Sequence, residues 1–265
     1  MSELTTDTTD RARSRRRLFG IEIDALTIDE TIERCLGAIT AGELLEVGVV
    51  NAAKLVKMRR DAELHAAVTG CDLVVADGQS VVWASRLLRA PLPERVAGID
   101  LFQRLLAESE QKGHSVYFLG AKPDVLDEMG RRIGHWYPGL KVAGSRDGYF
   151  SEAEAPAVAD EIAASGADLL FLGMTSPKKE KFVAAYGQRS GAKVVHGVGG
   201  SFDVLAGKVR RAPAAWQRFG MEWLYRVLQE PRRLGPRYIT TNAAFIALVM
   251  REMVRPKYVA SGNKV

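Results

Sequence analysis

The chain contains the stretch Asp72-Leu73-Val74-Val75-Ala76-Asp77-Gly78-Gln79, in which a short apolar run ends at an acidic residue and a glycine. The residues that follow, Ser80 to Leu88, predict a helix, so the apolar run predicts a buried strand that leads into it. A carboxylate at the carboxyl end of such a strand lies at the edge where open α/β sheets bind their ligands. We therefore expect Asp77 to lie in a ligand site.

Short apolar runs alternate with helical patterns along the rest of the chain. We expect strands at Leu44 to Val50, Asp72 to Ala76, Ser115 to Leu119, Lys141 to Ala143, Leu169 to Leu172 and Lys193 to Val198. We expect helices at Ala52 to Val68, Ser80 to Leu88, Ile99 to Gln111, Asp124 to Trp136, Ala153 to Ala164 and Pro177 to Arg189. This alternation predicts a Rossmann-like α/β fold, with a largely parallel sheet and helices on both of its faces.

The composition is that of an ordinary globular protein. Of the 265 residues, 47% are hydrophobic and 26% are charged, which excludes a disordered chain. Cys35 and Cys71 form no CxxC pair, so we expect two buried thiols in a reducing compartment. The N-terminus lacks the apolar core of a signal peptide, and the apolar run Ala243 to Met250 is too short for a bilayer of about 30 Å. These features predict a cytoplasmic protein.

The net charge of +5 is concentrated near one end of the chain. The segment from Lys208 to Arg237 holds eight basic and two acidic residues, so it carries +6 and the remainder carries −1. Apolar residues recur among these arginines at helical spacing; they are Trp216, Phe219, Trp223, Leu224, Val227 and Leu228. A plain charge run is usually a solvated face, but an Arg-rich amphipathic helix suits an anionic membrane surface or a phosphate-bearing substrate.

Three of the predicted strands are followed by loops that contain glycine. The loops are Phe118-Leu119-Gly120-Ala121-Lys122-Pro123, Phe171-Leu172-Gly173-Met174-Thr175-Ser176-Pro177 and His196-Gly197-Val198-Gly199-Gly200-Ser201-Phe202-Asp203. Glycine lets a backbone approach a ligand closely, and the next helix can offer free N–H groups to a phosphate. One such loop is more often simple turn chemistry, but three in one α/β chain favour a nucleotide. None matches GxGxxG or GxxxxGK[ST], which disfavours a dehydrogenase or a P-loop ATPase.

The sequence shows no pattern typical of a metal site. Its four histidines do not fall at ligand spacings, and it contains neither GxSxG nor Asp-x-Asp. His196, beside the third glycine loop, is more often a satisfied structural histidine than a ligand contact. Chemistry on a phosphate leaving group then needs protein cations, and arginine is the best donor because it is permanently charged and bidentate.

Five blocks, in order, resemble the signature of the WecG/TagA/CpsF glycosyltransferases. They are Val50-Asn51-Ala52-Ala53-Lys54, Asp72-Leu73-Val74-Val75-Ala76-Asp77-Gly78, Pro93-Glu94-Arg95-Val96-Ala97-Gly98-Ile99-Asp100, Pro177-Lys178-Lys179-Glu180-Lys181 and Gly197-Val198-Gly199-Gly200-Ser201-Phe202-Asp203. The resemblance runs from about Phe19 to about Arg237. It implies an inverting enzyme of bacterial surface-polymer synthesis that works without a metal ion or other cofactor. Such an enzyme moves a sugar, typically of the N-acetylmannosamine type, from a UDP-sugar to a polyprenyl-diphosphate-linked saccharide.

The resemblance also implies roles for individual residues. Asp77 occupies the position of the general base, which takes a proton from the acceptor hydroxyl; the alternative is that it only caps the helix near Ser80. Asn51 resembles a sugar-contacting asparagine. Arg95 resembles an arginine aimed at the active site, and its alternative is a surface ion pair with Glu94. The other substrate-binding residues implied are Gly78, Lys179, Gly199, Gly200, Asp203, Arg226 and Arg233.

Three positions depart from the pattern of the family. Val49 stands where threonine is frequent, and Lys179 stands where glutamine is frequent, both beside the expected sugar pocket. A lysine there can pair with a carboxylate on the sugar or with a phosphate, or it is only a loop cation. Pro236 stands where a third arginine of the C-terminal segment is expected, although Arg232 and Arg237 flank it.

We therefore expect three parts in the chain. Residues 1–17 form a disordered basic tail that includes Arg11 to Arg17, residues 18–207 form the α/β catalytic core, and residues 208–265 form a helical appendage that associates with the membrane. The resemblance implies a peripheral protein on the inner face of the cell membrane, self-association through the core, and no nucleic-acid partner. Two other functions stay open: a soluble nucleotide-dependent oxidoreductase that uses the glycine loops, and a basic protein that binds nucleic acid through the Arg-rich segment.

Overall fold

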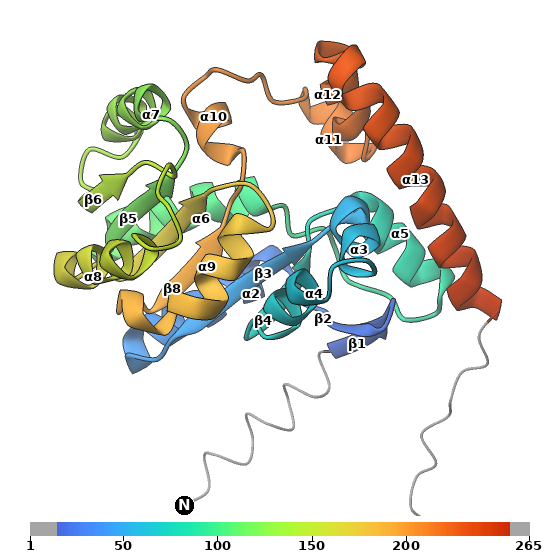
Figure 1. Ribbon diagram of the computed structural model, residues 1–265, viewed down its shortest axis with the longest axis horizontal. Coiled ribbons are helices and arrows are strands. Elements are labelled where there is room, and N and C mark those ends of the chain that lie inside the picture. Colours follow the sequence, from blue (N-terminus) through green and yellow to red (C-terminus); the bar gives the residue numbers. More distant parts are fainter. Residues whose placement is uncertain (1–14, 255–265) are drawn as a thin grey trace, which may run out of the picture.

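The computed structural model describes residues 15–254, except for the side chains of Arg233, Leu234 and Arg237. Its centre is a six-stranded sheet with the strand order β4-β3-β8-β7-β5-β6, in which every neighbouring pair is parallel (Figure 1). The strands are β3 (Leu45–Val50), β4 (Leu73–Ala76), β5 (Ser115–Gly120), β6 (Lys141–Arg146), β7 (Leu169–Gly173) and β8 (Val194–Gly197). The predicted α/β fold is confirmed, and all six predicted strands are present.

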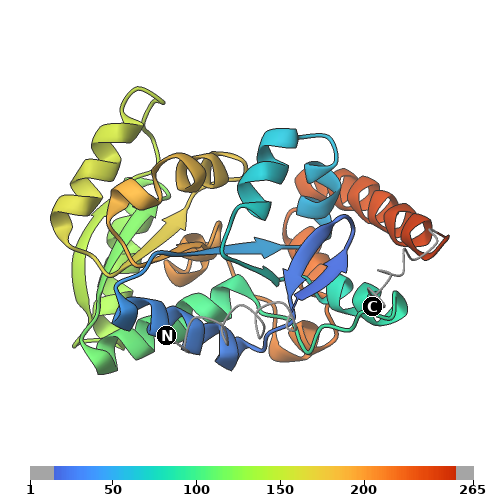
Figure 2. The same ribbon diagram turned by 90° about the horizontal axis from the view of Figure 1, so that it is seen from below.

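Helices cover both faces of this sheet (Figure 2). The helices on one face are α2 (Ile28–Ala41), α6 (Gly98–Lys112) and α7 (Pro123–Trp136), and those on the other are α3 (Ala52–Met58), α4 (Ala62–Thr69), α8 (Ala155–Ser165) and α9 (Lys178–Tyr186), while α5 (Gln79–Leu87) follows β4. Successive strand residues point to opposite faces, so Phe118 packs with the first group and Tyr117 with the second. The two apolar layers fix the sheet between the helices.

A hairpin precedes the sheet and consists of β1 (Arg15–Leu18) and β2 (Ile21–Asp24). We expect residues 15–17 in a disordered tail, but they form β1 instead. The reason is that Arg15 donates from Nε to Oδ1 of Asp24 at 3.0 Å and from Nη2 to the carbonyl of Asp72 at 2.8 Å. These bonds hold the strand against the sheet. Residues 1–14 of the expected tail lie outside the described chain.

Several boundaries differ from the expected ones. Helix α2 is not among the predicted helices, although Thr27 and Glu30 form a capping box that begins it. The helix expected over Ala52 to Val68 is divided into α3 and α4, because Asp61 caps a new helix. The helix expected over Pro177 to Arg189 ends earlier and is followed by the 3₁₀ turn η1 (Gln188–Ser190). Cys35 is buried and Cys71 is half-buried, and both are free thiols.

The segment after the sheet is helical, as expected. It contains α10 (Ser201–Leu205), α11 (Ala214–Arg218), α12 (Glu222–Gln229) and α13 (Pro231–Val254). Helix α13 runs along one side of the molecule and packs on α3 and the hairpin (Figure 1). Its buried side chains are Phe245, Leu248 and Val249, and the ring of Phe245 lies 5.5 Å from that of Phe19. Between residues 15 and 254, no helix combines the length and apolar character that a membrane span requires.

Candidate active site

Asp77 directly follows β4 and lies at the carboxyl edge of the sheet. Its backbone N–H donates to the carbonyl of Val50, so pairing with β3 continues to this residue. Its Oδ1 accepts a hydrogen bond from the N–H of Gly98 at 3.0 Å. Gly98 begins α6, so the half-buried carboxylate lies at the positive end of a helix dipole. In the described part of the chain Oδ2 has no partner, which leaves one oxygen available for a proton.

The alternative role for Asp77, as the cap of the helix near Ser80, is wrong. Helix α5 has Gly78 at its N-cap position, and no side-chain hydrogen bond caps it. The carboxylate instead joins β4 to α6, an element that begins 21 residues further along the chain.

Asn51 and Gly78 bring the ends of β3 and β4 into contact. A Cβ placed on Gly78 would lie 3.1 Å from the Cβ of Asn51, so a larger residue would push the two strand ends apart. Oδ1 of Asn51 accepts from the N–H of Lys54 at 3.0 Å and caps α3, which fixes the amide beside Asp77. The structure therefore brings Asn51, Asp77 and Gly78 together at one point of the sheet edge.

Arg95 lies in the segment that leads from this edge into α6. The adjacent N–H of Val96 donates to the carbonyl of Ala76 at 2.9 Å, so the segment is attached to the last residue of β4. The guanidinium, with 14% of its side chain exposed, pairs with Glu222 of α12 and lies 3.8 Å from Oδ2 of Asp100. Its expected alternative partner, Glu94, instead accepts from the N–H of Ile28 at 2.7 Å. That alternative is therefore wrong.

Arg211 completes a cluster of four charged groups with Arg95, Asp100 and Glu222. Its Nη1 lies 2.6 Å from Oδ1 of Asp100, and its Nε lies 3.6 Å from Oε1 of Glu222. The cluster contains two cations and two carboxylates, and it connects the core to α12. We call these four residues the appendage clamp.

Arg226 and Arg233 are the other two residues of the appendage that are expected to bind substrate. Arg226 is exposed and lies four residues after Glu222, so it is on the same face of α12 as the appendage clamp. Arg233 lies near the start of α13, but its side chain falls outside the described structure. Both residues stay predicted substrate contacts.

Glycine has two different roles in the three glycine loops, close packing and an open backbone. A Cβ on Gly120 would lie 2.5 Å from the backbone of Gly173, and one on Gly173 would lie 2.2 Å from the ring of Phe202. Those two glycines serve packing. A Cβ on Gly199 or Gly200 meets nothing within 4 Å, and Gly199 has φ +55°, so the loop after β8 is open to a ligand. Asp203 lies in the short α10 that follows this loop.

His196 is buried, as expected of a structural histidine, but its Nδ1 has no hydrogen-bond partner within residues 15–254. Its side chain lies 0% exposed at the end of β8, and its Nε2 lies 3.3 Å from the carbonyl of Gly98. Burial lowers the pKa of the imidazole to about 4, so the ring is neutral near pH 7. Gly98 thus has its N–H bound by Asp77 and its carbonyl beside His196, which holds the start of α6 at the sheet edge.

Lys179 is buried and forms part of a second charged group. Its Nζ lies 2.5 Å from Oε1 of Glu180, and Nζ of Lys54 lies 2.9 Å from the same oxygen. Burial, together with the charge of Lys54, lowers the pKa of Lys179 to about 8. Glu180 keeps a low pKa of about 2 because both lysines outweigh its burial. Lys179 is therefore not a loop cation.

Several residues of these two clusters were not assigned a role from the sequence. Lys54, Asp100 and Glu180 occur in the blocks that resemble the family, but nothing in the sequence shows which partners they meet. Arg211 and Glu222 contribute only to the charge count of the C-terminal segment. Their partners lie on elements that only the tertiary structure brings together.

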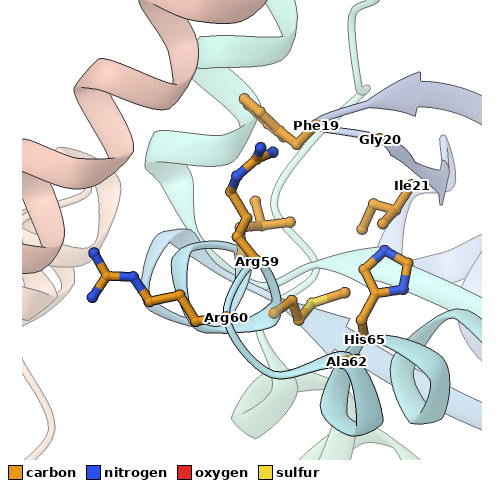
Figure 3. Close-up of a pocket in the computed structure, with 9 residues that line it drawn as sticks. Phe19, Gly20, Ile21, Arg59, Arg60, Ala62 and His65 are labelled. Carbon is orange, nitrogen blue, oxygen red and sulfur yellow. The ribbon is translucent and has the colours of Figure 1, made fainter.

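Two surface cavities lie apart from the predicted site residues. One of about 490 Å³ is lined by the hairpin turn and the α3–α4 turn, and Figure 3 shows Arg59 extending towards Phe19. The other, of about 430 Å³, is lined by residues that include Glu46, Glu63 and Lys181. Neither cavity contains a predicted site residue. Residues 15–254 contain no group of three or more His, Cys, Asp or Glu side chains arranged to hold a metal ion.

Comparison with known proteins agrees with the sequence blocks. A model of the family described as "Glycosyl transferase WecG/TagA/CpsF family" matches residues 16–258. The chain is 40% identical over 181 residues to the N-acetylglucosaminyldiphosphoundecaprenol N-acetyl-beta-D-mannosaminyltransferase of Bacillus spizizenii. That match covers 66% of this chain and 70% of the relative. The family match includes the sheet, the edge that holds Asp77, and all of α13.

Proposed function

The chain belongs to the WecG/TagA/CpsF family of glycosyltransferases, and from this premise we propose its reaction. It transfers N-acetylmannosamine or a related hexose from a UDP-sugar to a polyprenyl-diphosphate-linked saccharide, in the synthesis of a bacterial surface polymer. The transfer inverts the anomeric carbon and needs no metal ion. The relative from Bacillus spizizenii supports the sugar class, since its name specifies an N-acetyl-beta-D-mannosaminyl group and an N-acetylglucosaminyldiphosphoundecaprenol.

The single observation that supports this chemistry best is the geometry of Asp77. One carboxylate oxygen is fixed by the N–H of Gly98, and the other has no partner in the described structure. Inversion requires the acceptor hydroxyl to lose its proton as it attacks the anomeric carbon, and a positioned carboxylate is a suitable general base. Asn51, fixed beside Asp77, can hold a sugar hydroxyl in the same region.

We propose that arginines of the sheet edge and the appendage stabilise the departing UDP. Arg95 is oriented by Glu222 and Asp100 next to the sheet edge, and Arg226 lies on the facing side of α12. A guanidinium keeps its charge at all working pH values and offsets the negative charge that develops on the leaving diphosphate. Arg233 is proposed as a second appendage arginine with the same role.

We also propose that the appendage places the enzyme on the inner face of the membrane. Helix α13 buries one face against the core and exposes Ile246, Met250 and Val254 on another. An apolar stripe on a helix whose segment is Arg-rich suits an anionic bilayer surface, where the acceptor lipid is found. Self-association of the core is a further proposal, which light scattering of the purified protein tests.

A transfer assay tests the proposed reaction directly. Purified protein is incubated with UDP-N-acetylmannosamine and a detergent-dispersed polyprenyl-diphosphate-linked N-acetylglucosamine, with and without a chelator. We expect a disaccharide-lipid product of inverted configuration by mass spectrometry and NMR, formed equally in both conditions. Loss of turnover with the chelator, followed by its return when a divalent ion is added, would contradict the metal-free mechanism. If no product forms with any UDP-hexose, the proposed function is contradicted.

A further inference from the structure

Lys54 and Lys179 share a single carboxylate in the interior of the protein. Their ammonium groups lie 2.9 Å and 2.5 Å from Oε1 of Glu180. The side chains of the three residues are 8%, 9% and 7% exposed. No other acceptor within residues 15–254 contacts either ammonium group. We call these three residues the lysine cluster.

The lysine cluster holds one more positive charge than it can neutralise. Two ammonium groups offer six N–H donors to one carboxylate, and both contact the same oxygen, while Oε2 of Glu180 is buried without a partner. A buried charge without a counter-charge is costly. Lys179 also lies in the first turn of α9, where the helix dipole disfavours a cation. An anion bound to the two ammonium groups would neutralise the surplus charge and offset the unfavourable interaction of Lys179 with the helix dipole.

The lysine cluster lies at the edge of the sheet that carries the candidate site. The alkyl chain of Lys179 covers Gly197 at the end of β8, where a Cβ would lie 2.9 Å from its Cε. Lys54 is in the first turn of α3, and its N–H is bound by the side chain of Asn51. Strands β8 and β3 are neighbours, and β3 is the neighbour of β4, which ends at Asp77. The surplus charge is therefore next to the residues that are proposed to hold the donor.

We propose that the lysine cluster binds an anionic group of the sugar-nucleotide donor, either a phosphate of its diphosphate or a carboxylate on its sugar. This inference rests on the proposed function, because it takes the donor to be a UDP-sugar. Lys179 is then a donor-specificity residue that the chain carries in place of the more frequent glutamine. Lys54 is the second cation of the same subsite, and Glu180 holds the two ammonium groups in place.

Binding measurements on full-length Lys179→Gln test the proposal. Glutamine keeps a polar side chain and leaves Lys54 and Glu180 as a neutral pair, so we expect the variant to keep the fold. The matched control is Lys181→Gln, which removes a lysine of the same helix whose side chain is 41% exposed and pairs with Glu63 at 2.7 Å. Affinities for uridine, UDP, UDP-glucose and UDP-glucuronate are measured by calorimetry for each protein. A loss of affinity for UDP indicates that the lysine cluster binds a phosphate. A loss of affinity for UDP-glucuronate but not for UDP-glucose indicates that it binds a carboxylate on the sugar.

We expect Lys179→Gln to weaken either UDP or specifically UDP-glucuronate about 10- to 100-fold, with uridine unchanged, because a charge-assisted contact is lost. Lys181→Gln is expected to match the wild type for all four ligands. Equal affinities of Lys179→Gln and the wild type for UDP and for UDP-glucuronate would overturn the proposal and leave the proposed function intact. An equal loss for uridine would also overturn it, since it would indicate general disruption. If the folded wild type binds none of the uridine nucleotides, the proposed function itself fails.

Discussion

The carboxylate of Asp77 and the backbone N–H of Gly98 are hydrogen-bonded at 3.0 Å, across 21 residues of sequence. This bond fixes the carboxylate at the end of β4 and attaches the first turn of α6 to the sheet edge. The same glycine has its carbonyl 3.3 Å from Nε2 of His196, so a catalytic candidate and a buried histidine hold one residue from two sides. The geometry of the proposed base therefore depends on a helix that also carries the partner of Arg211, Asp100.

Replacement of the proposed base should separate binding from chemistry. In Asp77→Asn the amide oxygen still accepts from Gly98, so the edge keeps its shape, but the side chain no longer takes a proton. We expect UDP affinity to change less than about threefold and turnover to fall about 100- to 10,000-fold, the range for loss of a general base. Calorimetry and a product assay on the lipid acceptor measure the two effects.

A second aspartate supplies the control for this substitution. Asp61 caps α4 with a hydrogen bond of 2.9 Å to the N–H of Leu64, and asparagine is an equally good cap. Asp61→Asn should therefore keep both binding and turnover. Turnover of Asp77→Asn close to that of Asp61→Asn would show that Asp77 is not the base.

His196 should make the fold sensitive to acid. Burial lowers its pKa from 6.5 to about 4, so the unfolded chain takes up a proton between these pH values while the folded chain does not. The free energy of unfolding contributed by His196 therefore falls as pH decreases from 6.5 to 4, by about 3 kcal/mol over the whole range. Chemical denaturation of the wild type and His196→Gln across this range measures the contribution.

The effect of His196 is obtained from the difference in unfolding free energy between the wild type and His196→Gln. This comparison is needed because Glu46 changes the stability of the fold in the opposite direction as pH falls. Burial, and then the charge of Asp72, raises the pKa of Glu46 to about 7, so this residue stabilises the fold as pH falls through 7. Glu46 is present in both proteins and cancels in the comparison. A free-energy difference between wild type and His196→Gln that is constant from pH 7 to pH 4 would contradict the assignment of a neutral, buried imidazole.

Some residues of the site are positioned by local sequence, and others only by distant partners. Asp77, Gly78 and Asn51 were predictable, because each follows an apolar strand and parallel strands end at the same edge. The partner of Arg95 was not, since Glu222 is 127 residues away on a helix whose packing the sequence does not reveal. The same holds for Lys179, whose burial arises only where α9 packs beside α3 and α4.

The sequence pattern gave the wrong prediction at Arg15, where an ion pair orders a segment whose basic composition is typical of a disordered tail. Arg15 belongs to a basic run that predicts a tail, yet a nearly fully buried Asp24 orders it as a strand. Helix α2 is a different case, because the sequence does contain a local signal for it. Thr27 and Glu30 have the spacing of a capping box.

Breaking the appendage clamp should reduce turnover without unfolding the core. Glu222→Gln removes the carboxylate that pairs with Arg95 and lies 3.6 Å from Nε of Arg211, so α12 and its Arg226 lose their fixed position. We expect turnover to fall about tenfold, since misplacement of a positioning group by about 1 Å costs up to about 100-fold. Stability should change by less than about 1 kcal/mol, because the residues are partly exposed.

Glu128→Gln is the matched control for this variant. Glu128 contacts Arg131 and lies 2.7 Å from Arg132, both on its own helix α7. Its loss removes a carboxylate with two arginine partners but does not touch the appendage. Equal turnover of Glu222→Gln and Glu128→Gln would show that the appendage clamp has no role in the reaction.

The exposed apolar face of α13 should bind lipid, and a charge on that face should prevent it. Ile246 is 59% exposed and Met250 is 62% exposed, one helical turn apart and turned away from the buried Phe245. We expect Ile246→Glu to weaken sedimentation with phosphatidylglycerol-containing vesicles about tenfold, because an apolar side chain loses its burial and a negative charge meets anionic lipid. Val142→Glu is the control, since Val142 is 49% exposed on the edge strand β6 and makes no part of the appendage. If both variants bind vesicles as the wild type does, α13 is not the membrane contact; if both lose binding equally, added negative charge alone accounts for the effect.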